Sequence, residues 1–227
     1  MDNLVATPRT ALLAGATGLV GRALLSMLLA STRYRSVHVL LRRMPPDVKA
    51  SAKLEIHHVD FGRLPDALPM ADDVFIALGT TIKVAGSEAA FRRVDFDYVV
   101  NTARAGRAAG ARRLAVVSAV GADAKSRIFY NRVKGEMQDA IAHLGYESVV
   151  IAQPSFLLGD RVALGQPPRS AEIWAARLLG PLGWIMPKGV RPIPARAVAS
   201  ALLAAILDGK AGVHVLKSGA MRARGEP

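Results

Sequence analysis

Short apolar runs alternate with longer amphipathic stretches along most of the chain, and this alternation restricts the fold more than any other feature. It is the pattern of βαβ units, in which each strand of a parallel sheet is followed by a helix that crosses the sheet. The expected strands are residues 10–14, 37–41, 54–58, 74–78, 114–117, 148–152 and 213–216. The expected helices are residues 19–29, 88–109, 128–144 and 195–207. The sequence therefore predicts an α/β fold, a doubly wound parallel sheet of about seven strands.

The length of 227 residues suits one large domain, and 51% of the residues are hydrophobic, which is enough for a substantial core. No internal repeat or linker divides the chain, so we expect a single domain over residues 1–227. Residues 155–194 depart from the alternation, and we expect them to form a small C-terminal lid, an insertion that covers the substrate. Trp174 and Trp184 in this segment suit either a substrate contact or core filling.

Two absences limit the location and the chemistry. No apolar run reaches the roughly 18 residues that a transmembrane helix needs, so we expect no membrane span and a cytoplasmic location. Cysteine is absent, which excludes disulfides and thiol catalysis.

The formal net charge of +12 raises the question of a nucleic-acid partner. Of the 30 positive residues 22 are arginine, and they are spread along the chain rather than gathered in a block. No aromatic platform or nucleic-acid-binding motif accompanies them. We therefore expect these arginines to form a solvated basic surface, and we expect no nucleic-acid partner. The expected partner is a small-molecule substrate, and the expected oligomeric state is a monomer or homodimer.

A glycine-rich turn lies between the first strand and the first helix, in the order Gly15-Ala16-Thr17-Gly18-Leu19-Val20-Gly21. One glycine allows a tight turn, one lets the backbone approach a pyrophosphate, and one lets the helix pack closely on the strand. The helix N-terminus then offers free N–H groups and a positive dipole to phosphates. This turn, directly after a strand, predicts a Rossmann dinucleotide site.

The residues after the second strand indicate which dinucleotide binds. NAD sites commonly place an acid there to accept from the ribose 2′-hydroxyl. Here Arg42 and Arg43 stand instead, and guanidinium groups bind a 2′-phosphate well. We therefore expect NADP (NADPH) as the cofactor. Asp60, after the third strand, suits either a contact with the adenine amino group or an ordinary loop.

Tyr130 and Lys134 stand four residues apart, on one face of an expected helix. The ammonium favours the ionised phenol and prepares Tyr130 for general acid/base work. Lys134 is also expected to reach the ribose hydroxyls of the cofactor. Ser118, at the end of the fifth strand, is placed to hydrogen-bond a substrate carbonyl. We expect Ser118, Tyr130 and Lys134 to be the catalytic residues.

Taken together, these motifs resemble the atypical, extended-like short-chain dehydrogenases/reductases, and most of all the small Tat-interacting-protein-like oxidoreductases and their bacterial relatives. The resemblance covers about residues 10 to 217 and includes the segments 78–81, 94–99, 118–123 and 130–136. It implies that the cofactor lies across the carboxyl ends of the strands. It also implies that the NADP site includes Thr17, Gly18, Leu19, Val20, Arg42, Arg43, Leu78, Gly79, Tyr130, Lys134 and Arg161. With Gly15, Gly21, Asp60, Thr80 and Pro154, these residues make up the whole expected cofactor site. No metal ligands are expected.

Three positions depart from the family pattern. Ala119 stands where a second serine is common, so Ser118 would act alone. Asp95 stands where many extended members have asparagine, and Gln153-Pro154-Ser155 replaces an Arg-Pro-Gly turn.

These observations predict an NADPH-dependent oxidoreductase that reduces a small or hydrophobic carbonyl by hydride transfer. One alternative is a regulatory or interaction protein that senses NADP without turnover. Another is an enzyme resembling nucleotide-sugar epimerases and dehydratases, although such enzymes need a larger C-terminal substrate domain. Both Tyr130 and Lys134 are retained, and this favours the oxidoreductase.

Overall fold

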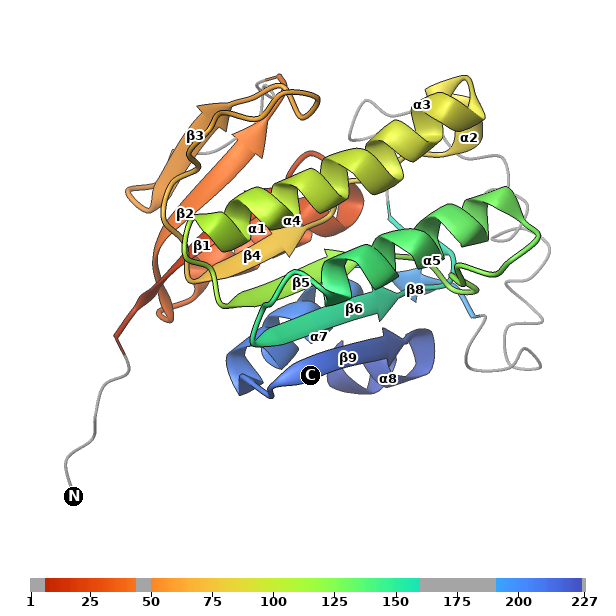
Figure 1. The fold of residues 1–227 in the computed structure, drawn as a ribbon. Helices are drawn as coiled ribbons and strands as arrows, with labels where there is room; N and C mark the ends of the chain where they lie inside the picture. The colour runs from red at the N-terminus through yellow and green to blue at the C-terminus, as the bar shows by residue number, and fades with distance from the viewer. Residues whose placement is uncertain (1–6, 44–49, 160–190, 226–227) are drawn as a thin grey trace.

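The computed structural model describes residues 7–43, 50–159 and 191–225. Seven parallel strands form its main sheet, in the order β3-β2-β1-β4-β5-β6-β9 (Figure 1). Their bounds are β1 Arg9–Ala14, β2 Tyr34–Leu41, β3 Leu54–His58, β4 Asp73–Ile76, β5 Arg113–Val117, β6 Ser148–Gln153 and β9 Gly212–Lys217. The strand order starts in the middle of the sheet and reverses between β1 and β4, which is the doubly wound Rossmann topology. The predicted fold class and all seven predicted strands are confirmed.

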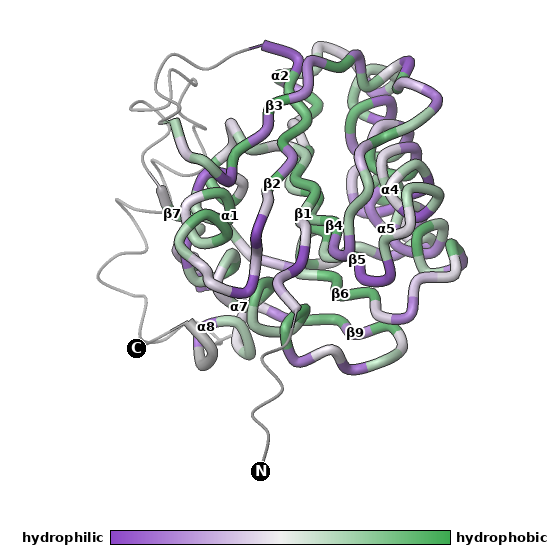
Figure 2. The backbone as a smooth tube through the Cα atoms, turned by 90° about the vertical axis from the view of Figure 1, so that its left-hand side faces the viewer, coloured by the Kyte–Doolittle hydropathy of each residue, from purple (hydrophilic) through white to green (hydrophobic). Residues whose placement is uncertain are grey.

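Helices cover both faces of this sheet, as Figure 2 shows in a view along it. On one face lie α1 (Leu19–Ala30), α7 (Ala195–Asp208) and α8 (Ser218–Gly225); on the other lie α4 (Tyr98–Ala108) and α5 (Phe129–Ala142). Each face therefore has its own apolar core, one packed around α1 and α7 and one around α4 and α5. Burial on both sides explains why the central strands are apolar runs rather than alternating ones.

The predicted helix over residues 88–109 is interrupted. It consists of α3 (Glu88–Arg92), a π-helical turn η1 (Arg93–Asp97) and α4. A π turn fits one extra residue into the helix, and such turns are frequent at functional sites. Here the buried carboxylate of Asp95 lies in the turn.

The sequence did not predict several short elements. These are α2 (Ile82–Ala85), α8, and a two-stranded sheet of β7 (Leu157–Leu158) with β8 (Ile193–Pro194). β4 also ends at Ile76, before the expected Leu78, because the chain leaves the sheet there. Most of the expected lid, with Trp174 and Trp184, lies outside the described residues.

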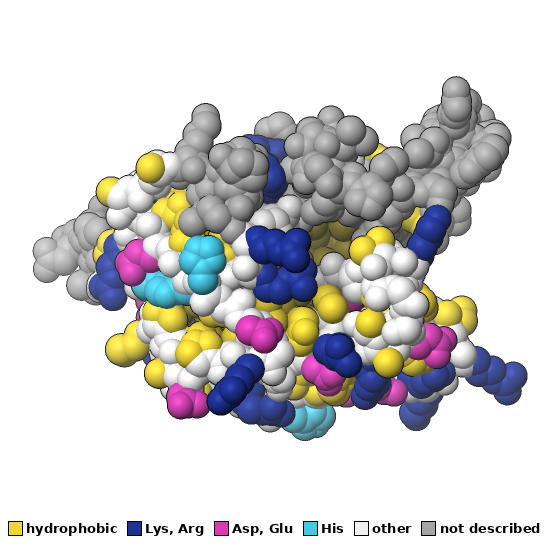
Figure 3. Space-filling model, turned by 90° about the horizontal axis from the view of Figure 1, so that it is seen from above, with side chains coloured by type: hydrophobic (Ala, Val, Ile, Leu, Met, Phe, Trp, Pro, Cys, Tyr) yellow, Lys and Arg dark blue, Asp and Glu magenta, His cyan; other side chains and the backbone are white. Residues whose placement is uncertain are grey.

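Several of the arginines that give the chain its positive charge make ion pairs. Arg92 pairs with Glu136, Arg112 Nε lies 2.6 Å from Glu147 Oε1, and Arg113 Nη1 lies 3.0 Å from Asp73 Oδ1. In the view from above, positive, negative and apolar side chains are interspersed on the described part of the surface (Figure 3). Among the described helices, none has the length and apolar character that crossing a bilayer requires.

Candidate active site

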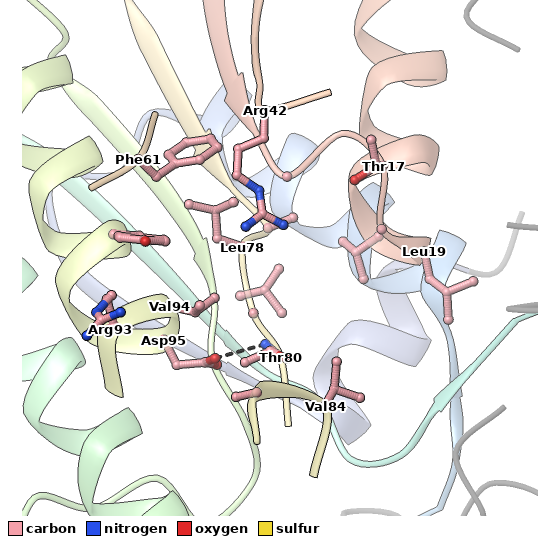
Figure 4. Close-up of a pocket in the computed structure, with 18 of the residues that line it drawn as sticks. Thr17, Leu19, Arg42, Phe61, Leu78, Thr80, Val84, Arg93, Val94 and Asp95 are labelled. Carbon is pink, nitrogen blue, oxygen red and sulfur yellow. Dashed lines mark hydrogen bonds between the residues drawn. The ribbon is translucent and has the colours of Figure 1, made fainter. Parts of the chain in front are cut away.

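A cleft of about 720 Å³ opens at the carboxyl ends of the strands, where the strand order reverses between β1 and β4. This switch point is where ligands bind in doubly wound sheets. The predicted residues that line the cleft are Gly15, Thr17, Gly18, Leu19, Val20, Arg42, Arg43, Leu78, Gly79, Thr80, Ser118, Tyr130 and Lys134. Figure 4 shows the glycine turn with Thr17 and Leu19 on one side and the residues of η1 on the other.

The three glycines of the turn differ in what surrounds them. Gly15 has φ +89°, and a β-carbon there would lie 2.5 Å from the carbonyl carbon of Ala77. A β-carbon on Gly21 would lie 1.9 Å from Gly15 O, so this glycine lets α1 pack against the turn. A β-carbon on Gly18 would lie 3.6 Å from Gly15 O, an ordinary van der Waals contact. The packing of the described residues therefore does not require glycine at position 18, whereas a ligand against the backbone would.

The N-terminus of α1 is suited to an anion. Its N-cap is Gly18, no side chain caps it, and its first turn has no acidic residue. The first N–H groups of a helix lack partners within the helix, and the dipole adds positive potential there. The residues present thus fit the diphosphate of a dinucleotide.

Arg42 and Arg43 follow β2 at the rim of the cleft, and both are exposed. Arg42 extends into the cleft opposite Phe61 (Figure 4). Phe61 is 5% exposed, lines the same end and stacks on Tyr98, with ring centroids 6.0 Å apart. Asp60 does not line the cleft, and its Oδ1 accepts a hydrogen bond of 2.8 Å from Gly62 N. The geometry therefore favours the ordinary-loop alternative for Asp60.

Lys134 forms a buried ion pair that the sequence did not predict. Its Nζ lies 2.7 Å from Asp95 Oδ1, and the two side chains are 4% and 1% exposed. The other carboxylate oxygen, Asp95 Oδ2, accepts from Thr80 N at 2.8 Å (dashed line in Figure 4). Asp95 thus joins the loop after β4 to α5, and its place in η1 aims it at Lys134.

Tyr130 is half-buried at the start of α5, and its ring packs on Phe91 with centroids 5.1 Å apart. Ser118 is 4% exposed and lies directly after β5. Gln138 Nε2 donates to Ser118 Oγ at 2.5 Å. The three predicted catalytic residues are therefore brought to one cleft, while their roles remain predictions.

Two other predicted residues, Gly21 and Pro154, do not line the cleft. Gly21 lies behind the turn, and Pro154 is buried, its carbonyl accepting from Val120 N at 2.9 Å. Arg161 lies outside the described residues. Conversely, the cleft includes residues that no motif singled out for the site: Phe61, Val84, Ala85, Ala90, Arg93, Val94, Asp95 and Tyr98. Asp95 was visible as a departure from the family pattern, but the pairing with Lys134 depends on a π turn that a regular helical period does not reveal.

One group of potential metal ligands occurs within the described residues, away from the cleft. His38, Glu55 and His57 on β2 and β3 have ligand atoms within 4.8 Å of one another. His38 Nδ1 and His57 Nε2 are 3.0 Å apart and share a hydrogen bond. Burial lowers the pKa of His38, with the neighbouring His57 adding to the effect and Glu55 opposing it.

Comparison with known proteins identifies the family. A family model described as NAD(P)H-binding matches residues 15–153. The chain belongs to this NAD(P)H-binding family. The match spans both the glycine turn and the Tyr-Lys helix. It confirms a nicotinamide dinucleotide as the class of cofactor, and the choice of NADP over NAD stays a prediction.

Several curated proteins are similar to this chain in sequence. HTATIP2 of Rattus norvegicus is 33% identical over 172 residues, which cover 74% of this chain and 69% of that protein. A mitochondrial fmp52 protein of Emericella nidulans is 33% identical over 178 residues, 75% of each chain. FMP52 of Candida albicans is 34% identical over 152 residues, 65% of this chain and 66% of that protein. The resemblance to atypical short-chain dehydrogenases and the Tat-interacting-protein group is confirmed.

Solved structures share the fold. MoeE5 in complex with UDP-glucuronic acid and NAD has a TM-score of 0.68 at 21% identity, covering 91% of this chain and 75% of that one. A short-chain dehydrogenase/reductase family oxidoreductase of Burkholderia thailandensis has a TM-score of 0.64 at 18% identity, covering 95% and 94%. At these identities the likeness concerns the fold alone.

These comparisons contradict the expected cytoplasmic location, because the FMP52 relatives are named as mitochondrial proteins. The expectation came from composition and from the lack of an apolar span. Such bulk properties reflect the folded core, whereas sorting depends on short signals that the fold does not constrain.

Proposed function

We propose that this protein is an NADPH-dependent oxidoreductase that reduces a small or hydrophobic carbonyl compound. The proposal is supported by one observation: the residues predicted to bind the cofactor and the residues predicted to be catalytic line the same cleft. The glycine turn and the two arginines line it from the side of β1 and β2, and Ser118, Tyr130 and Lys134 line it from the side of β5 and α5.

The nicotinamide, when bound, supplies the hydride. The residues of the chain do the remaining work. The hydroxyl of Ser118 donates to the carbonyl oxygen, on which negative charge grows as the hydride arrives. The phenol of Tyr130 gives that oxygen a proton, as a general acid in the transition state. Lys134, held by Asp95, positions the ribose of the cofactor next to Tyr130.

NADPH is preferred to NADH in this proposal, because Arg42 and Arg43 at the rim carry positive charge where an acid would repel a 2′-phosphate. A well-formed contact between arginine and phosphate contributes about 1.5–3 kcal/mol, or tenfold and more in affinity. Calorimetric titration should therefore show NADPH binding at least tenfold more tightly than NADH. Equal affinities, or an unchanged preference in Arg42→Ala/Arg43→Ala, would refute this part.

A hydrophobic carbonyl suits the cleft because Val84 and Ala85 of α2 and Ala90 of α3 add apolar side chains to its lining. In a pocket of this kind a few polar groups orient the ligand and apolar side chains bury it. A sugar nucleotide would require charged or polar partners for a second diphosphate, and the shared fold with MoeE5 supplies no evidence for them here.

Turnover distinguishes the enzyme from an NADP sensor. NADPH oxidation is followed with benzaldehyde, acetophenone and menadione, for the wild type and for Tyr130→Phe. The proposal predicts turnover by the wild type that Tyr130→Phe abolishes while NADPH affinity stays nearly unchanged, because only the transition state uses the proton. Tight NADPH binding without turnover would favour the sensor, and a Tyr130→Phe variant with most of its rate intact would end the assignment of Tyr130.

A further inference from the structure

Gln138 lies one helical turn beyond Lys134, so Tyr130, Lys134 and Gln138 follow one another along the same side of α5. Tyr130 and Lys134 line the cleft, whereas Gln138 does not. Gln138 is half-buried, and its side chain reaches Ser118 at the end of β5.

Two hydrogen bonds run in series through this glutamine. Gln153 Nε2, at the end of β6, donates to Gln138 Oε1 at 3.1 Å. Gln138 Nε2 in turn donates to Ser118 Oγ at 2.5 Å. We call Gln153, Gln138 and Ser118 the amide relay. Its members come from β6, α5 and the end of β5, so the fold itself brings them together.

The relay has a direction. An amide NH₂ group has hydrogens to donate and accepts none, so Ser118 Oγ must accept from Gln138. The hydrogen of the Ser118 hydroxyl is then left for another acceptor, and no described residue provides one. Ser118 lines the cleft, where a substrate carbonyl would be that acceptor.

We propose that Gln138 is a positioning residue that fixes the Ser118 hydroxyl as a hydrogen-bond donor to the substrate carbonyl. The inference rests on the proposed carbonyl reduction and goes beyond the Ser-Tyr-Lys set. It explains how one serine can act alone beside Ala119, because a hydroxyl that is already oriented needs no reorganisation as charge develops. Without the relay the same hydroxyl rotates among its staggered positions.

Exchange of Gln138 for glutamate tests the direction. The Gln138→Glu carboxylate can only accept, so it would draw the Ser118 hydrogen away from the substrate. We expect kcat for the fastest substrate among benzaldehyde, acetophenone and menadione to fall by about 10²–10³-fold, the usual cost of one lost oxyanion donor, with the KM for NADPH unchanged. Gln138→Met removes the hydrogen bond without reversing it and should cost only roughly two- to tenfold. Asp139→Asn, an exposed carboxylate–amide exchange on the next residue, is the control and should retain the wild-type rate.

A double-mutant cycle shows whether the effect passes through Ser118. In a Ser118→Ala background, Gln138→Glu should cost nothing further, because the donor is already absent. A full additional loss, or a raised KM for NADPH, would mean that the glutamate acts through Lys134 instead and would overturn the relay. A wild-type rate in Gln138→Glu would also overturn it while leaving the proposed function intact. If none of the carbonyl compounds supports NADPH oxidation by the wild type, the proposed function is refuted, and the role of the relay with it.

Discussion

The buried pair of Lys134 and Asp95 makes a sharp prediction for Asp95→Asn. Asparagine keeps the shape of the side chain, and its Oδ1 can still accept from Thr80 N. It removes the charge that faces the Lys134 ammonium at 2.7 Å. The substitution therefore tests the ion pair rather than the packing of η1.

The expected size of the effect follows from the burial of both groups, which are 4% and 1% exposed. Removing one partner of a buried pair leaves an uncompensated charge and typically costs about 3–5 kcal/mol. For a domain of this size each kcal/mol shifts the melting temperature by roughly 2–4 °C. We therefore expect Asp95→Asn to melt about 6–20 °C below the wild type.

Thermal unfolding by circular dichroism measures this effect, with Lys134→Met and the double variant alongside. Either single substitution should destabilise, and the double variant should recover much of the loss, because replacing a buried pair by neutral groups is often close to neutral. Single variants that melt within 1–2 °C of the wild type, less than the shift for about 1 kcal/mol, would refute the reasoning. A double variant whose drop in melting temperature equals the sum of the two single drops would also refute it.

Other predictions follow from the same structure. Gly21→Ala should lower both thermal stability and NADPH affinity, because its β-carbon would lie 1.9 Å from Gly15 O. Gly18→Ala should melt like the wild type and lose only NADPH affinity. Melting curves and calorimetric titration compare the two variants, and equal melting temperatures would contradict the distinction. Ser118→Ala should reduce the rate of carbonyl reduction by about 10²–10³-fold and leave the Kd of NADPH unchanged; unchanged NADPH oxidation would remove Ser118 from the site. Because burial lowers the pKa of His38 below its unfolded value of about 6.5, its contribution to stability is present above that pH and lost as the pH falls through the folded pKa. Urea unfolding at about pH 8 and pH 5 should show this loss, and His38→Gln should reduce it; an unaltered pH dependence in the variant would contradict it.

The sheet was predictable from the sequence because each central strand is buried on both faces and so reads as an apolar run. β3 matches the expected residues 54–58, and the other six strands differ by a few residues at their ends. The glycine turn was predictable for a related reason, since Gly15 and Gly21 are required by local backbone contacts that leave a clear spacing in the sequence.

The interior of the site was less predictable, because it depends on contacts between distant segments. The ion pair of Asp95 with Lys134 requires the π turn η1, and a regular helical period gives no sign of it. Phe61 and Gln138 belong to no motif, and only the packing of the loop after β3 and of α5 brings them to Tyr98 and Ser118. Asp60 was considered for the adenine from its position after a strand, yet its carboxylate bonds its own loop.

The central claim is that this cleft transfers a hydride from NADPH to a carbonyl carbon, with Tyr130 giving the proton. The most direct measurement uses NADPH carrying deuterium at C4 of the nicotinamide, with mass spectrometry of the alcohol formed from benzaldehyde or acetophenone, whichever is reduced faster. Our account predicts one deuterium on the carbinol carbon with one stereoisomer of the labelled cofactor and none with the other, and no labelled alcohol with Tyr130→Phe. NADPH that binds in the cleft and is recovered with its label, with no alcohol formed by the wild type, would contradict it.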